Sequence, residues 1–107
     1  MDFSTKRCAP CEGGVSPLQE KSIKESLSYL KTTWEVVDKK KIRKEFSFKN
    51  FKEAMKFVNS VADIAHGENH HPDISIHWNK VVIELWTHAI GGLSENDFIV
   101  ASKIEKI

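Results

Sequence analysis

A chain of 107 residues, 40% of them hydrophobic and 29% charged, can bury one core and has the composition of a single soluble domain. Its formal net charge of +1 argues against a nucleic-acid binder that relies on bulk electrostatic attraction. The sequence shows neither an apolar run of membrane-spanning length nor the apolar stretch of a secretory signal, so we expect a cytoplasmic protein.

The two cysteines, Cys8 and Cys11, form a CxxC pair within residues 1–14, which we interpret as an N-terminal tail ahead of a single domain at 15–107. Such a pair is typical of a redox motif or of half a zinc site. The strand-then-helix context of a redox motif is missing, and so is the second cysteine pair that would complete a structural zinc shell. We therefore expect the cysteines to pack or stay reduced without a catalytic role.

The segment after the tail predicts a helix followed by a first hairpin. Ser16 is suited to cap the helix, and apolar residues at helical spacing continue to about 32–33. Apolar residues at 34–37 predict a short strand, and the alternation at 42–48 predicts a second, half-buried strand. The lysine-rich segment between them, at 38–40, is expected to be a solvated turn.

A second helix is expected to begin after Asn50, which is suited to cap it, with Glu53 at the capping-box spacing. Gly67 is expected to end this helix. Apolar residues recur at helical spacing between these ends and predict one buried stripe: Phe51, Met55, Phe57, Val58, Val61, Ala62, Ile64 and Ala65.

Alternating apolar residues on both sides of Asn79 and Lys80 predict a second hairpin with that pair as its two-residue turn. In this register Trp78 faces Val81 across the turn and lies on the apolar face of the hairpin. We therefore expect Trp78 to pack in the core.

The opposite face of this hairpin carries Val82 and Trp86, which are unusual on a purely solvated surface. Either another subunit or the N-terminal tail is expected to cover them. Together with an exposed strand edge, they favour a homo-oligomer.

The last helix is expected to begin after Ser94, with Asp97 as a capping residue that also complements the helix dipole. Phe98, Ala101 and Ile104 supply its buried stripe. The resulting order, α-β-β-α-β-β-α, predicts an α+β domain: a four-stranded antiparallel sheet with three helices on one face.

Candidate functional residues concentrate in the second half of the chain, where His70, His71 and His88 fall within nineteen residues. Histidine exchanges a proton readily near neutral pH. Pro72 favours an extended backbone at His71, and neighbouring side chains on an extended segment point in opposite directions. The adjacent imidazoles are therefore expected to flank a site.

The spacing of a larger set of residues resembles the signature of the pterin-4a-carbinolamine dehydratases. Three, five, nine and eight residues separate its members: His66, His70-His71-Pro72, Trp78, His88 and Asp97. Three further segments are similar to that family: Asn79-Lys80-Val81, Thr87-His88 and Gly92-Leu93-Ser94-Glu95. The resemblance covers residues 15–107 and implies the family's fold, a four-stranded antiparallel sheet with three helices. It also implies that the homo-oligomer is a homodimer or a homotetramer built as a dimer of dimers.

The resemblance implies a hydro-lyase that converts 4a-hydroxytetrahydrobiopterin to quinonoid dihydropterin and water, without metal or organic cofactor. The substrate is the oxidised pterin that aromatic amino acid hydroxylases release during tetrahydrobiopterin recycling. An acid must protonate the leaving hydroxyl and a base must accept the N5 proton. The resemblance implies His70 and His88 as this pair and His71 as the residue that positions the pterin. Substrate contacts are expected from three neighbours: His66, Asp73 and Thr87.

The sequence departs from the better-known animal members of the family at His66 and Asn69, where those proteins carry carboxylates. Because a nearby carboxylate raises the pKa of a histidine, the acid is expected to be weaker here unless another carboxylate compensates. Glu68 and Asp73 are the candidates for that role.

Two other classes of function compete with a dehydratase. A metal-binding module could use the five histidines of the chain, His66, His70, His71, His77 and His88. Adjacent histidines diverge, however, and no His-x-His pair stands with a carboxylate, so we expect no bound metal and a surface position for His77. The second alternative is a non-catalytic interaction or assembly protein of the same fold, a role that some family members have.

Overall fold

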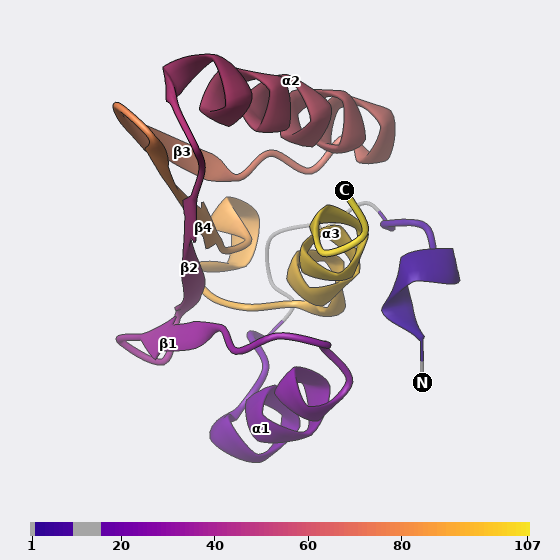
Figure 1. Ribbon diagram of the computed structural model, residues 1–107. Helices are drawn as coiled ribbons and strands as arrows, with labels where there is room; N and C mark the ends of the chain where they lie inside the picture. The colour runs from indigo at the N-terminus through magenta and orange to yellow at the C-terminus, as the bar shows by residue number, and fades with distance from the viewer. Residues whose placement is uncertain (1, 10–15) are drawn as a thin grey trace.

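The computed structural model describes residues 2–9 and 16–107, which form an α+β fold with three helices on one face of a four-stranded antiparallel sheet (Figure 1). The predicted fold class and element order are confirmed. In chain order the elements are η1 (Phe3–Thr5), α1 (Glu20–Ser28), β1 (Glu35–Val37), β2 (Lys41–Ser47), α2 (Phe51–Glu68), β3 (Asp73–His77), β4 (Lys80–Leu85), η2 (His88–Ile90) and α3 (Glu95–Ile104).

The strands lie in the order β1-β2-β4-β3, so each hairpin contributes one central and one edge strand. Apolar side chains of β4 that point toward the helices are fully buried, as at Val81, Ile83 and Leu85. Helix α3 lies between α1 and α2 (Figure 1) and is buried on nearly all sides. Its first turn is therefore placed deep in the fold, beside the ends of α2 and β4.

Helix α1 begins later and ends earlier than the sequence predicts. Its N-cap is Gln19 rather than Ser16, because Leu18 donates its backbone N–H to the Leu93 carbonyl at 2.8 Å and holds the preceding chain extended. The helix ends at Ser28, and Glu105 accepts hydrogen bonds from the residues that follow.

Helix α2 begins as predicted, since the Asn50 side chain accepts the backbone N–H of Glu53 at 2.9 Å. The predicted stop at Gly67 is wrong: the helix runs to Glu68 and ends at Asn69, which has the left-handed φ of 52°. The predicted stripe is also too wide, because Phe51 and Ala62 are exposed. Its buried residues are Ala54, Phe57, Val61 and Ala65.

The second hairpin turns one residue earlier than predicted. His77 pairs with Lys80, which leaves Trp78 and Asn79 as the turn. Asn79 fixes this position by exchanging hydrogen bonds with Phe48: its side chain donates to the Phe48 carbonyl, and its own carbonyl accepts the Phe48 N–H. The prediction that Trp78 packs in the core is therefore wrong; its side chain is 67% exposed and its φ is 53°.

The sheet face opposite the helices is not covered by the described part of the tail. Residues 2–9 lie beside α3 (Figure 1), with Phe3 buried in the core. Val82 is only 7% exposed on that open face, and Trp86 is half-buried within the single chain. Another subunit or the N-terminal tail was expected to cover Val82 and Trp86, and the described part of the tail does not do so.

The loop between α1 and β1 is fastened by a single carboxylate at the C-terminal end of α3. Glu105 accepts the backbone N–H groups of Lys31 and Thr32 at 2.9 and 2.7 Å and the Trp34 indole N–H at 3.2 Å. The Thr32 hydroxyl donates to it as well. This cluster ties the loop to α3 and places the Trp34 ring in the core.

We expect Glu105→Ala to lower the free energy of unfolding by about 2 kcal/mol, because several donors lose a charged acceptor at once. Urea denaturation followed by circular dichroism measures the change. Glu45→Ala, at an exposed position on the open face of the sheet, is the matched control and should change stability by less than about 0.5 kcal/mol. Equal effects of the two substitutions would contradict the proposed fastening role.

Candidate active site

An open pocket of about 500 Å³ lies where the chain leaves α2, leaves β4 and enters α3. It contains the three histidines of the sequence prediction, together with Asp73 and Thr87 from the predicted substrate contacts. Its lining residues are Ala9, Asn69, His70, His71, Pro72, Asp73, Trp86, Thr87, His88, Ala89 and Asn96. The sequence prediction did not include Ala9, Trp86 or Asn96 among the site residues.

The end of α2 places His70 and His71. The left-handed Asn69 lets the His70 N–H donate to the Ala65 carbonyl at 3.1 Å, while its own N–H bonds the His66 carbonyl at 3.2 Å. This pair of bonds is the Schellman arrangement, which turns the chain sharply out of a helix. The two histidines are therefore presented from a fixed backbone.

A closed loop after β4 places His88. Thr87 and Gly92 form an isolated antiparallel bridge, and η2 with its left-handed Gly91 (φ 67°) fills the loop between them. A Cβ atom on Gly92 would approach the Pro17 ring to 2.7 Å, so the close packing at that position requires glycine. His88 is exposed at the start of this loop, on the wall of the pocket.

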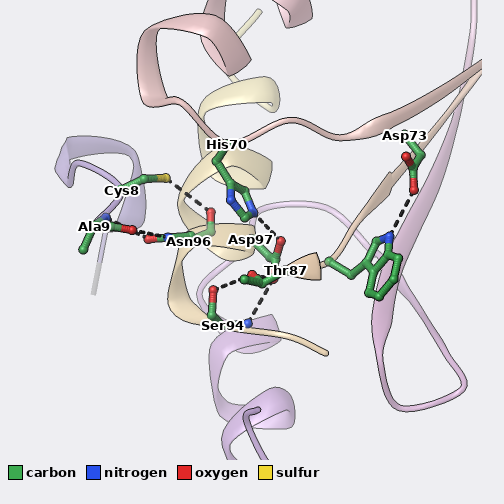
Figure 2. A network of polar contacts seen from close by, with 9 residues as sticks. Cys8, Ala9, His70, Asp73, Thr87, Ser94, Asn96 and Asp97 are labelled. Carbon is green, nitrogen blue, oxygen red and sulfur yellow. Dashed lines mark hydrogen bonds and ion pairs between the residues drawn. The ribbon is translucent and has the colours of Figure 1, made fainter. Parts of the chain in front are cut away.

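A fully buried carboxylate connects these segments (Figure 2). Asp97 accepts the Ser94 backbone N–H at 2.9 Å and, with the Ser94 side chain, completes the predicted capping box. It also accepts the Thr87 hydroxyl at 2.9 Å and lies 2.6 Å from Nε2 of His70. The capping role is confirmed, and the contact with His70 adds a second role.

The contact with Asp97 selects the tautomer of His70. A carboxylate only accepts hydrogen bonds, so Nε2 carries the proton and donates it. The His70 side chain is 12% exposed and Asp97 is not exposed at all. Burial strengthens the hydrogen bond between them, because little water screens it. In the neutral imidazole, Nδ1 is then the nitrogen left with a lone pair.

A second polar contact orients the other wall. The Trp86 indole N–H donates to an Asp73 carboxylate oxygen at 3.1 Å, and the ring of His88 packs on the indole with centroids 3.9 Å apart. Lys41 lies over the same indole at 5.1 Å. The presence of Trp86 on an outward-facing stretch was the sequence signal that could have identified it as a site residue.

Two of the predicted residues lie away from the pocket. His66 is exposed on the last turn of α2 and is not a lining residue, and Trp78 lies in the hairpin turn. His77 is exposed, as expected. Within residues 2–9 and 16–107, no three His, Cys, Asp or Glu side chains are arranged to hold a metal ion, and no helix is long and apolar enough to cross a membrane.

The two carboxylates considered as partners for the histidines have other contacts. Asp73 accepts the Trp86 indole, and Glu68 accepts Lys103 at 2.6 Å and the Cys8 backbone N–H at 2.9 Å. The carboxylate that contacts a pocket histidine directly is Asp97. His70 therefore has a carboxylate partner, although positions 66 and 69 carry no acid.

Comparison with known proteins supports the family resemblance that the sequence suggests. A family model described as pterin 4 alpha carbinolamine dehydratase matches residues 16–107. A relative from Nitrosospira multiformis is 53% identical over 99% of this chain and 92% of its own length. One from Rickettsia canadensis is 48% identical over 96% of this chain and 94% of its own length. Both relatives carry the provisional name pterin-4-alpha-carbinolamine dehydratase.

Two solved structures share the fold. A transcriptional coactivator/pterin dehydratase from Brucella melitensis superposes with a TM-score of 0.78 at 33% identity, covering 85% of this chain and 97% of that one. A pterin dehydratase-like protein, identified as a RuBisCO assembly factor in the alpha-carboxysome, has a TM-score of 0.61 at 19% identity and covers 71% and 89%. The second similarity concerns the fold alone.

Glu68 is expected to make stability depend on acidity. Burial alone raises the pKa of Glu68, but hydrogen bonds from Lys103 and the Cys8 N–H and the charge of Arg7 outweigh it, so its pKa lies below the ordinary 4.5. The ionised Glu68 therefore stabilises the folded state fully above pH 4.5, and this stabilisation is lost as pH falls through the lower pKa that Glu68 has in the folded state.

We expect Glu68→Gln to be about 1–2 kcal/mol less stable than the parent at pH 7, and this gap should close toward pH 3. Urea unfolding across that pH range measures the gap. Glu53→Gln, on the exposed side of α2, serves as the control. A gap that stays constant down to pH 3 would show that the charge of Glu68 contributes nothing.

Cys8 is expected to be an unreactive thiol, whereas Cys11 lies outside the described residues. Burial, followed by the charge of Glu68, raises the pKa of Cys8 to about 12, and its Sγ donates to the Asn96 carbonyl at 3.6 Å. In a Cys11→Ser background at pH 8, iodoacetamide should alkylate Cys8 at least about 100-fold more slowly in folded protein than in urea. Equal rates in the two states would refute this assignment.

Proposed function

The chain belongs to the pterin 4 alpha carbinolamine dehydratase family, and we propose that it removes water from 4a-hydroxytetrahydrobiopterin to give quinonoid dihydropterin. The observation that carries the proposal is the common pocket of His70, His71 and His88. Its volume of about 500 Å³ lies in the range of small-molecule sites and suits a bicyclic ring.

The reaction needs two proton transfers. The C4a–O bond breaks as an acid protonates the hydroxyl, which leaves as water, and the N5–H bond gives its proton to a base while its electrons form the C4a=N5 double bond. Positioned acids and bases typically accelerate such steps by about 10²–10⁴-fold. The pocket supplies imidazoles for both steps, and the reaction regenerates them when the protons return to solvent.

We assign the base to His70. Its Nε2–H is held by Asp97, so Nδ1 has the free lone pair that can accept the N5 proton. The imidazolium formed on protonation is then stabilised by the buried carboxylate, the arrangement by which a carboxylate supports a histidine base in hydrolases. This assignment makes Asp97 a positioning residue for the reaction as well as a helix cap.

His88 is the remaining candidate for the acid. It is exposed to solvent, from which it can regain a proton after each turnover, and its packing on Trp86 orients the imidazole. His71 follows His70 in the non-helical segment before β3 and lines the same pocket, and we assign it to hold the pterin. Thr87 and Asp73 line the same pocket and complete the proposed set of substrate contacts.

The test is dehydration of synthetic 4a-hydroxytetrahydrobiopterin, measured above the uncatalysed rate. We expect His70→Ala and His88→Ala each to lower kcat at least about 100-fold, and His71→Ala mainly to raise KM. The parent rate should fall on both sides of neutral pH, as expected for one acid and one base. His77→Ala, an exposed histidine outside the pocket, is the control and should retain full activity.

Asp97→Asn tests the link to His70, because the amide can still cap α3 but lacks the charge. We expect it to lower kcat in the parent and to add little in a His70→Ala background, which shows that the two residues act together. An inactive parent that binds no pterin would overturn the dehydratase proposal and favour an interaction or assembly role. An active His70→Ala,His88→Ala protein would overturn the assignment of the acid and base.

A further inference from the structure

Residues 2–9 precede the part of the chain that the family model matches, yet they reach the pocket. Phe3 anchors them: it is 3% exposed, and its ring lies 6.1 Å from that of Phe98 and 5.9 Å from that of Tyr29. The segment then runs along α3 (Figure 1) and brings Ala9 to the pocket wall. One lining residue of the pocket, Ala9, therefore lies outside the matched region.

The position of Ala9 is fixed by a reciprocal clamp. The Ala9 N–H donates to Oδ1 of Asn96 at 3.0 Å, and Nδ2 of Asn96 donates to the Ala9 carbonyl at 2.6 Å. Glu68 accepts the preceding Cys8 N–H at 2.9 Å. Since Asn96 adjoins Asp97 in the first turn of α3, the Ala9 wall and His70 are held by the same turn.

The pocket has two chemically different ends. In Figure 2, Ala9 and Asn96 lie on one side of His70, and Asp73 lies on the other. The Asp73 end carries an exposed carboxylate that suits hydrogen-bond donors. At the Ala9 end, Asn96 uses its side-chain amide on the Ala9 backbone, and the residue that lines the pocket there is small and uncharged.

A reduced pterin has a matching polarity. Its 2-amino group and N3–H, both donors, lie at one end of the bicycle, and the C6 substituent lies at the other, with C4a and N5 between them. With the reacting atoms at His70 and the donors at Asp73, the C6 substituent extends toward Ala9. This orientation rests on the proposed function.

We propose that Ala9 is a specificity-determining residue, the wall against which the C6 side chain of the pterin lies. A small residue at position 9 leaves room for a substituent longer than a methyl group. A larger one would shorten the pocket at this end without touching His70, His71 or His88.

The test compares two stable ligands, 7,8-dihydrobiopterin with its dihydroxypropyl group and 6-methyl-7,8-dihydropterin, by calorimetry on the full chain. We expect Ala9→Trp to weaken binding of the first at least about tenfold and of the second less than about threefold, since pocket size discriminates by such factors. Ala62→Trp, an exposed alanine of α2 outside the pocket, should change neither. Circular dichroism verifies the fold of each variant.

Asn96→Ala provides an independent variant, because it releases the clamp without filling the pocket. We expect it to narrow the difference in affinity between the two ligands. Equal weakening of both ligands by Ala9→Trp, or no change in either variant, would overturn the proposal. A parent that binds both pterins but fails to dehydrate the carbinolamine would refute the proposed function while leaving this test intact. A parent that binds neither would refute both.

Discussion

The buried carboxylate of Asp97 joins three segments that the sequence separates: the exit from α2, the end of β4 and the first turn of α3. Burying a carboxylate is costly unless hydrogen-bond donors satisfy it. Each of its three donors comes from a different one of these segments, so the carboxylate is satisfied only when all three meet. The contact that completes the fold here is the same contact that orients His70.

The sequence predicted the local half of this arrangement. The spacing of Ser94 and Asp97 is enough to predict a helix cap, because the donor and acceptor lie within one turn. The contacts with His70 and Thr87 cross 27 and 10 residues, and no local period encodes them. The same distinction applies to the whole site: the histidines and their common pocket could be expected, whereas the partners that orient them depend on tertiary packing.

The main errors in the predicted elements concern where helix α2 ends and where the second hairpin turns. Glycine can continue a helix at a cost of about 1 kcal/mol, and here the chain turns only at Asn69, where the His70 N–H can reach the Ala65 carbonyl. The alternation around Trp78 predicted the two strands correctly, but it placed the turn one residue too late. That turn is set by Asn79 through its bonds to Phe48, a residue that precedes α2. At the end of α2 the deciding contact is local, whereas at the hairpin a polar contact from another segment decided between local alternatives.

Three residues at the start of α3 carry these contacts. Ser94 caps the helix, Asn96 holds Ala9, and Asp97 holds His70 while it serves as a cap. A helix N-terminus offers unpaired N–H groups that must be satisfied in any case, so a carboxylate placed there is stabilised before it contacts the imidazole. The site therefore obtains a fixed carboxylate from a requirement of the fold.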